Sequence, residues 1–442
     1  MAVAAFVSGT SPFERGAGGI YSLSMKQLYT QVIADVRDGK AGTIHPELYR
    51  AYCDNFRKGV SGVLGQDSYG DRYLAMQDQF ESNVARFAAY KAFHATQQLE
   101  RQLADHDGVA RSPEAFDRMA SAVLNTFNRY QAAEYNTAVA RARTAKQWAD
   151  FSQGDNMFLF PNIRWLPSRS ANPREQHMPF YNHVWAKTDP FWNSNQPGNL
   201  WNCKCDWEET DDPVTGDNPE GIRPAKGLEG NPADTGQIFT DQCTYVKKAG
   251  KQGTKETEDF FRPIAEHHQE YLGYRNNPDY QEVDFDWGTG GVKAKHKDHK
   301  THPNDNQRYF PEQLTGDQLE QEFMDKAFAL GHSVVFKAEA ANVTDLDMYL
   351  DGKLMDLISP TENSTHYRNP LGRKNHQLKK YNDLHEEENG SICMYFHDPT
   401  FYSIDKVERG LQEVRRWTDR VDIRKVYILK NDGSDIIELD FP

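Results

Sequence analysis

The sequence contains no apolar run approaching the roughly 18 residues that a membrane-spanning helix requires, so no membrane span is expected. The apolar stretch at residues 1–7 is short and lacks a basic segment, so no signal peptide is predicted. The five cysteines are an odd number and are scattered except for one close pair, which indicates a reducing compartment rather than a disulfide framework. With 51 basic and 65 acidic residues, the net charge is −14, so any nucleic-acid binding must be local.

The chain is long and rich in aromatic residues. Its 442 residues predict two to four domains, and 12% aromatic residues argue against a disordered protein. We expect a multidomain α+β protein. The predicted parts are a helical region at 1–152, a loop-rich subdomain at 153–245, a linker at 246–311 and an α/β domain at 312–442.

The first part has a helical pattern. Residues 130–151 are rich in Ala, Arg, Gln and Glu, which are good helix formers. Apolar residues upstream recur at three- and four-residue spacing and predict one packing face. They are Phe116, Met119, Val123, Phe127 and Tyr130.

After Gly154, prolines interrupt any long helix and aromatic residues become dense. This stretch carries a series of short motifs, in the order of an arginine-and-histidine segment (164–177), Asp189-Pro190-Phe191-Trp192, Asn202-Cys203-Lys204-Cys205, Gly230-Asn231-Pro232, Thr235-Gly236 and Phe239-Thr240.

This series resembles the phage minor head proteins of the Mu F type, also described as head morphogenesis proteins. The resemblance covers residues 20–245. It implies a structural component of the phage head, placed near the portal and present in few copies.

Cys203 and Cys205 are candidate zinc ligands, with His177 near them in sequence. Thiolate and imidazole groups suit tetrahedral zinc. However, Cys-x-Cys is tighter than the usual zinc spacing and no second cysteine pair follows. Two reduced thiols in an aromatic pocket are therefore the alternative.

The expected linker is polar and contains His296, His299 and His302 at three-residue spacing among lysines. Such a group is able to ligate a metal. The alternative is a solvated, locally basic loop that contacts nucleic-acid phosphates.

Asp351-Gly352 lies between two runs of alternating apolar residues. An Asp-Gly pair in that setting is a strong hairpin signal, because both central residues of a type I′ turn need φ > 0. Counting outward from the turn places Asp347 opposite Asp356. Two facing carboxylates repel each other, and a bound divalent cation such as Mg²⁺ would offset that cost. The alternative is that the acids discourage pairing between sheets.

From residue 312 onward, the pattern predicts the order helix, three strands, helix, strand, helix and two strands. Thr315 and Gln318 form a capping box for the first helix, and the second helix is predicted at 376–388.

Helix, three strands, helix, strand is the core order of the PD-(D/E)xK nuclease superfamily, which residues 315–441 resemble. In that superfamily, acidic residues on the second and third strands bind Mg²⁺ or a similar ion, and a lysine follows two positions after the second acid. Asp347 and Asp356 occupy the acidic positions, whereas Ile358 stands at the lysine position.

The resemblance assigns further residues. A lysine supplied by the following helix is known in the superfamily; Lys374 and Lys379 are the candidates here, and Lys374 is assigned the catalytic role. Gln377 opens a Gln-x-x-x-Tyr pattern seen on that helix in some members, and Glu320 matches an acid on the first helix. Residues 351–360 are also similar to C-terminal tRNase toxins of contact-dependent inhibition systems. The implied catalytic set is Glu320, Asp347, Asp356, Lys374 and Gln377.

Arg368, Arg373 and Lys379 form a basic cluster beside these residues, which indicates contact with an RNA or DNA backbone. An ordinary solvated surface is the alternative.

Taken together, the two resemblances imply a phage minor head protein that carries a metal-dependent nuclease, acting on tRNA or other RNA. Its partners would be portal and capsid proteins, nucleic acid and an immunity protein. Its location would be the virion or the bacterial cytoplasm. One alternative is a purely structural protein with a degenerate nuclease fold. Another is a metal-independent barnase- or EndoU-like RNase that uses His366, His376 and His385 as acid–base groups.

Overall fold

The computed structural model describes residues 25–65, 70–154, 156–217, 221–299, 307–338, 345–385 and 390–441. The chain divides into two compact units, Met1–Phe261 and Arg262–Pro442, and the division falls within helix α7 (Thr244–Arg275). A helical N-terminal region and a mixed sheet in the C-terminal part confirm the predicted combination of helices and strands.

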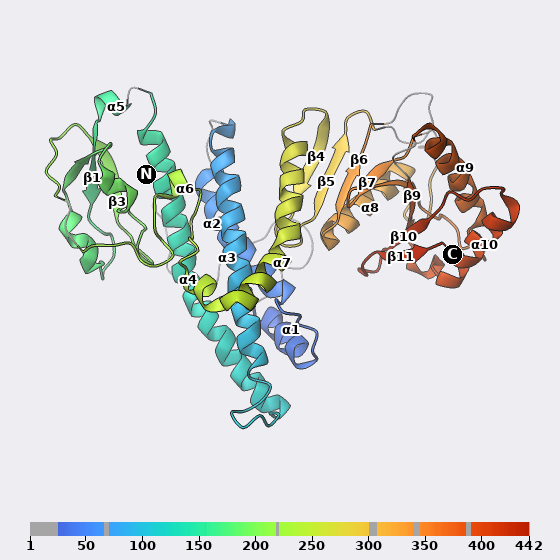
Figure 1. Cartoon of the computed structure of the whole chain (residues 1–442), viewed down its shortest axis with the longest axis horizontal. Coiled ribbons are helices and arrows are strands. Elements are labelled where there is room, and N and C mark those ends of the chain that lie inside the picture. Colours follow the sequence, from blue (N-terminus) through green and yellow to red (C-terminus); the bar gives the residue numbers. More distant parts are fainter. Residues whose placement is uncertain are drawn as a thin grey trace. The chain divides into compact units, whose positions relative to one another are not determined.

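Four helices form the first part of the N-terminal unit, and α2, α3 and α4 pack against one another (Figure 1). Ser112 caps the longest of them, α4, by accepting a hydrogen bond from the Ala115 N–H at 3.3 Å, and Pro113 fits the first helical position. The four helices are α1 (Met25–Arg37), α2 (Pro46–Leu64), α3 (Leu74–Glu100) and α4 (Pro113–Phe151).

The apolar stripe predicted on α4 is only partly correct. Phe116 and Phe127 are buried, but Met119 and Tyr130 are 43% and 58% exposed. The buried face runs instead through Phe116, Ala120, Leu124 and Phe127.

Two buried cations connect this helical layer. Lys91 of α3 is fully buried against the Glu134 carboxylate of α4, which also accepts a hydrogen bond from the Tyr245 hydroxyl at 2.7 Å. Arg141 of α4 donates to the carbonyl oxygens of Leu228 (2.8 Å) and Gly230 (3.2 Å). Arg141 thereby holds the Gly-Asn-Pro motif segment against α4.

The loop-rich part of the N-terminal unit contains a three-stranded antiparallel sheet in the order β2-β1-β3. Its core consists almost entirely of aromatic rings, with Trp165, Trp185, Trp192 and Trp207 all buried. The elements are α5 (Asn156–Leu159), β1 (Asn162–Leu166), the 3₁₀ helices η3 (Glu175–Phe180) and η4 (Pro190–Asn193), β2 (Val184–Ala186), β3 (Asp206–Thr210) and α6 (Pro232–Thr235).

The C-terminal unit is built on an eight-stranded mixed sheet whose spatial order follows the sequence, from β11 at one edge to β4 at the other. The pairs β5–β6, β8–β9 and β9–β10 are parallel, and the others are antiparallel. The strands are β4 (Tyr280–Phe285), β5 (Val292–His296), β6 (Ser333–Phe336), β7 (Met348–Leu350), β8 (Lys353–Ile358), β9 (Ser391–Phe396), β10 (Lys425–Lys430) and β11 (Ile437–Asp440).

Helices cover both faces of this sheet (Figure 1). On one face, Leu354 and Ile358 of β8 pack into a core shared with α9 (Arg368–Leu384) and α10 (Ile404–Trp417). On the other face, Met355 and Leu357 pack with α8 (Gly316–Leu330). The capping box predicted at the start of α8 is present, and Gly331 ends the helix with φ 100°.

The predicted linker at 246–311 is wrong, because most of that range is regular structure. It contains most of α7 and all of β4 and β5, and both strands pair into the C-terminal sheet. In β5, Val292 and Ala294 are buried between more exposed lysines. This two-residue alternation is hidden in sequence by the surrounding charge.

Candidate functional site

The hairpin between β7 and β8 has the predicted geometry. Asp351 and Gly352 adopt φ of 48° and 71°, as the central residues of a type I′ turn require. The register pairs Leu350 with Lys353 and Met348 with Met355. Continuing that register brings the residue before β7, Asp347, alongside Asp356.

Asp356 is fully buried and lies on the face of β8 that packs against α9. The Lys374 ammonium from α9 lies 2.5 Å from Asp356 Oδ1 and 3.9 Å from Asp347 Oδ2. Asp347 Oδ2 also accepts a hydrogen bond from the Leu357 N–H at 2.7 Å. One lysine therefore contacts two carboxylates, one just before β7 and one in β8.

Lys374 supplies from α9 the positive charge that the resemblance places at position 358 of β8. Ile358, at the position where a lysine was expected from the resemblance, is buried in the core beneath α9. A lysine at position 358 would replace an apolar side chain of the core. Lys374 reaches the carboxylates from α9 and leaves Ile358 in the core.

The electrostatics of the pair follow from burial. Burial, followed by the neighbouring Asp347 carboxylate, raises the pKa of Asp356 well above its usual range, although Lys374 acts in the opposite direction. Burial acts to lower the pKa of Lys374, but Asp347 and Asp356 outweigh it, so that pKa is raised. Lys374 is therefore held as a cation beside a carboxyl group that resists ionisation.

The surroundings of Asp356 Oδ2 are those of an oxygen that a metal ion would suit. This oxygen is buried and no hydrogen-bond donor contacts it; Asp356 shares a hydrogen bond with Asp347 in its protonated form, whereas its ionised form leaves the oxygen without a partner, which is costly. A cation on the Oδ2 side would satisfy it. Asp347 and Glu320, whose side chains are about one-fifth exposed, offer further oxygens of the kind that Mg²⁺ prefers.

Glu320 approaches this pair from α8. Its negative charge contributes to the raised pKa of Lys374, and its Oε2 lies 3.4 Å from Nε2 of the buried His299. His299 Nδ1 lies 3.0 Å from the Lys337 carbonyl oxygen. His299 is a neighbour of the site that the sequence did not indicate, because its only signal was a histidine run in a supposed linker.

The proposed run of three metal-binding histidines is not brought together in the described residues. His296 packs edge-on against Tyr280 with ring centroids 5.1 Å apart, whereas His299 turns to Glu320. His302 lies outside the described residues.

Gln377 supports the site indirectly, through the segment that leads into β7. Its side-chain amide donates to the Asp345 carbonyl oxygen at 2.9 Å, and the Asp345 carboxylate pairs with Lys337. These contacts fix the segment that enters β7. Gln377 is therefore a positioning residue in this geometry.

The predicted nucleic-acid residues all lie on α9. The Arg368 guanidinium stacks over the Trp417 ring at 4.9 Å, and Trp417 is 70% exposed. Arg373 is exposed and Lys379 is half-buried. Arg368 and Trp417 thus combine a cation with an open aromatic face.

The three histidines of the metal-independent alternative, His366, His376 and His385, are exposed. His385 stacks on Tyr381 with ring centroids 4.1 Å apart. Among the contacts that the structure describes, none joins two of these imidazoles.

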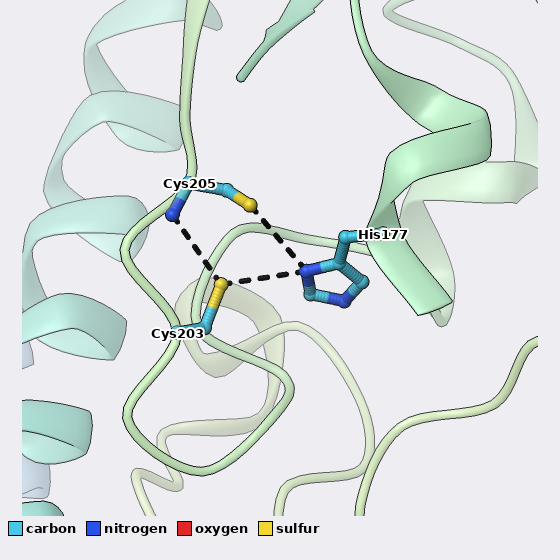
Figure 2. A group of neighbouring side chains, drawn as sticks. All are labelled: His177, Cys203 and Cys205. Carbon is cyan, nitrogen blue, oxygen red and sulfur yellow. Dashed lines mark hydrogen bonds between the residues drawn. The ribbon is translucent and has the colours of Figure 1, made fainter. Parts of the chain in front are cut away.

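His177, Cys203 and Cys205 do come together (Figure 2). His177 Nδ1 lies 3.4 Å from Cys203 Sγ and 3.5 Å from Cys205 Sγ. In the described part of the chain, one other set of three such residues has its ligand atoms within 4.8 Å of one another, Asp105, His106 and Asp107 in a solvent-exposed loop. Glu320, Asp347 and Asp356 do not form such a set.

No described helix is both long enough and apolar enough to cross a membrane. Comparisons of the chain with protein-family models, with curated proteins and with solved structures give no match.

Proposed function

We propose that the C-terminal unit is a metal-dependent nuclease that cleaves RNA, with tRNA as the expected substrate, and that the N-terminal unit is a minor head protein of a phage. The observation that carries the nuclease proposal is the convergence of Asp347 before β7, Asp356 of β8 and Lys374 of α9 around a buried carboxyl oxygen that no hydrogen-bond donor contacts.

The residues divide the chemistry among them. Asp347 and Asp356 would hold a divalent cation, with Glu320 as a third ligand directly or through water. When bound, that ion neutralises phosphate charge and makes water a better nucleophile. Lys374 stabilises the negative charge that develops on the phosphate. Gln377 keeps the β7 segment in place, and Arg368 and Arg373 attract the backbone.

A buried ion pair with a purely structural role is the main alternative, and it predicts different behaviour. Such a pair would give no cleavage of any substrate. A metal-independent RNase using His366, His376 or His385 would cleave without a divalent ion. The dependence on metal therefore separates the three interpretations.

The test uses the full chain with tRNA, an unstructured RNA and duplex DNA. We expect RNA cleavage in Mg²⁺, none in EDTA, and recovery when Mg²⁺ alone is added back. Asp347→Asn and Asp356→Asn should each lower the rate by at least about 100-fold, the upper end of the effect of even an outer-shell partner on a metal site.

The matched control is Asp325→Asn. Asp325 lies on α8 in the same unit but pairs with Lys293 at 2.9 Å, so its loss should leave the rate unchanged. Cleavage that survives EDTA would overturn the metal assignment. Absence of cleavage on all three substrates would favour the structural alternative.

The head-protein proposal rests on the resemblance of residues 20–245, and the contacts of its motifs support it. Arg141 fixes the segment around Gly230, while Asn83 of α3 exchanges two hydrogen bonds with the Phe239 backbone at 2.8 and 2.9 Å. The motif residues thus build a scaffold, as expected of a structural component of the virion. Co-purification with the portal protein encoded beside it tests this, and absence of any association would contradict it.

A further inference from the structure

We propose that His177, Cys203 and Cys205 bind one Zn²⁺ ion, which cross-links the 3₁₀ helix η3 to the loop before β3. The proposal is independent of the nuclease site, because its donors are nitrogen and sulfur in the N-terminal unit. The ion class follows from the donors, since two thiolates and an imidazole suit tetrahedral Zn²⁺.

The orientation of His177 is the first supporting observation. The ring is buried, and its Nε2 lies 2.8 Å from Asn199 Oδ1. Because a carboxamide oxygen only accepts, Nε2 carries the proton and Nδ1 presents a lone pair to the two sulfurs (Figure 2). An imidazole held by an outer hydrogen bond in this way is typical of metal ligands.

The second observation is that the two sulfurs share one imidazole nitrogen as a hydrogen-bond acceptor. The single lone pair of His177 Nδ1 faces both thiols, so it accepts from only one S–H at a time. The Cys205 backbone N–H points to Cys203 Sγ at 3.4 Å, a contact that favours a thiolate. A bound cation would form one bond to each sulfur and one to Nδ1, so the two thiols would no longer compete for the nitrogen lone pair.

Burial gives a third and separate observation. The Trp165 indole N–H is fully buried, its polar neighbour is the Cys205 side chain, and the Trp165 ring lies 5.0 Å from the His177 ring. A buried N–H needs a hydrogen-bond acceptor in such a core. It is better accommodated beside a site that holds thiolates than beside two neutral thiols.

Three protein donors leave one tetrahedral position for a solvent molecule. Tyr181, whose hydroxyl lies 4.0 Å from Cys205 Sγ, is partly exposed. The ion would join residues that are 26 positions apart in sequence and lie around the tryptophan core. Its role is therefore to fix the loop-rich subdomain.

The test measures metal directly in the full chain purified without chelators under reducing conditions. Elemental analysis should find one zinc per chain. Replacement by Co²⁺ should give the visible bands of a tetrahedral site together with thiolate-to-metal charge transfer. Removal of the ion should change tryptophan fluorescence, because Trp165 lies against His177.

Cys203→Ser, Cys205→Ser and His177→Asn should each lose the Co²⁺ bands. Cys243→Ser is the matched control, since Cys243 is a buried cysteine of the same unit that contacts the Gly227 carbonyl. Wild-type chain without zinc and without Co²⁺ bands would overturn the proposal, as would a Cys203–Cys205 disulfide in its intact mass. None of these measurements involves RNA cleavage, so their outcome is independent of whether the nuclease proposal is correct.

Discussion

Asp356 occupies a position that an apolar side chain would fill more favourably. Leu354 and Ile358, its neighbours on the same face of β8, are buried in the core beneath α9. A buried ion pair seldom stabilises a fold more than well-packed apolar residues do, because desolvation offsets the attraction. The presence of Asp356 with Lys374 at this buried position is therefore an argument for the proposed site, since it adds little to stability.

His332 is a second residue whose charge depends on its surroundings. Its Nδ1 lies 2.8 Å from Asp351 in the hairpin turn, and its Nε2 lies 2.9 Å from Asp435 before β11. Burial acts to lower the pKa of His332, but the two carboxylates outweigh it and raise that pKa. Burial acts to raise the pKa of Asp351, but His332 outweighs it and lowers that pKa.

We predict that this link stabilises the C-terminal unit in mildly acidic solution. Folded His332 binds its proton more tightly than unfolded histidine, so its contribution is complete below the unfolded pKa of about 6.5 and is lost as pH rises through the raised folded value. The contribution should be about 1 kcal/mol, or about 2–4 °C in Tm for a unit of this size. Thermal unfolding at pH 6 and pH 8.5 measures it.

His332→Gln should remove most of this pH dependence. The matched control is His366→Gln, because His366 is an exposed histidine of the same unit. If both variants keep the same difference in Tm between the two pH values, His332 is not the group responsible.

At the level of elements, local turn chemistry could be predicted and tertiary placement could not. The β7–β8 hairpin followed from Asp351-Gly352 alone, because few residue pairs tolerate two positive φ values. The second helix was predicted at 376–388 but begins at Arg368 and extends to Leu384; residues 386–388 lie outside the described part of the chain. Pro370 lies in the first turn of this helix, where proline is tolerated.

The candidate sites show the same contrast. Cys203, Cys205 and His177 could be proposed as a set from their closeness in sequence and their donor types. His299 could not be placed beside Glu320 without the fold, because β5 and the following loop had been assigned to a linker. Contacts between residues far apart in sequence depend on strand order, which the pattern of charge concealed.

For the whole molecule, the two units contain candidate sites of opposite chemical character. The N-terminal unit offers soft nitrogen and sulfur donors, whereas the C-terminal unit offers carboxylate oxygens. Metals that prefer one set bind the other poorly. The two sites can therefore be perturbed one at a time in the intact chain.

This separation leads to a prediction about unfolding. Two compact units of this size, each with its own core, should give two transitions in calorimetry of the full chain. A zinc-selective chelator should lower one of them, because the proposed ion fixes the loop-rich subdomain. Asp356→Asn should raise the other by a few degrees at neutral pH, since about 1 kcal/mol corresponds to 2–4 °C.

The direction of the second shift follows from the raised pKa of Asp356. Removing that buried carboxyl leaves Lys374 paired with Asp347, so the charge on the lysine keeps a partner. Asp325→Asn, on the exposed face of α8, should change the free energy of unfolding of neither unit by more than about 0.5 kcal/mol. Helix α7 contains residues of both units, and one merged transition that responds equally to the chelator and to Asp356→Asn would show that α7 couples them.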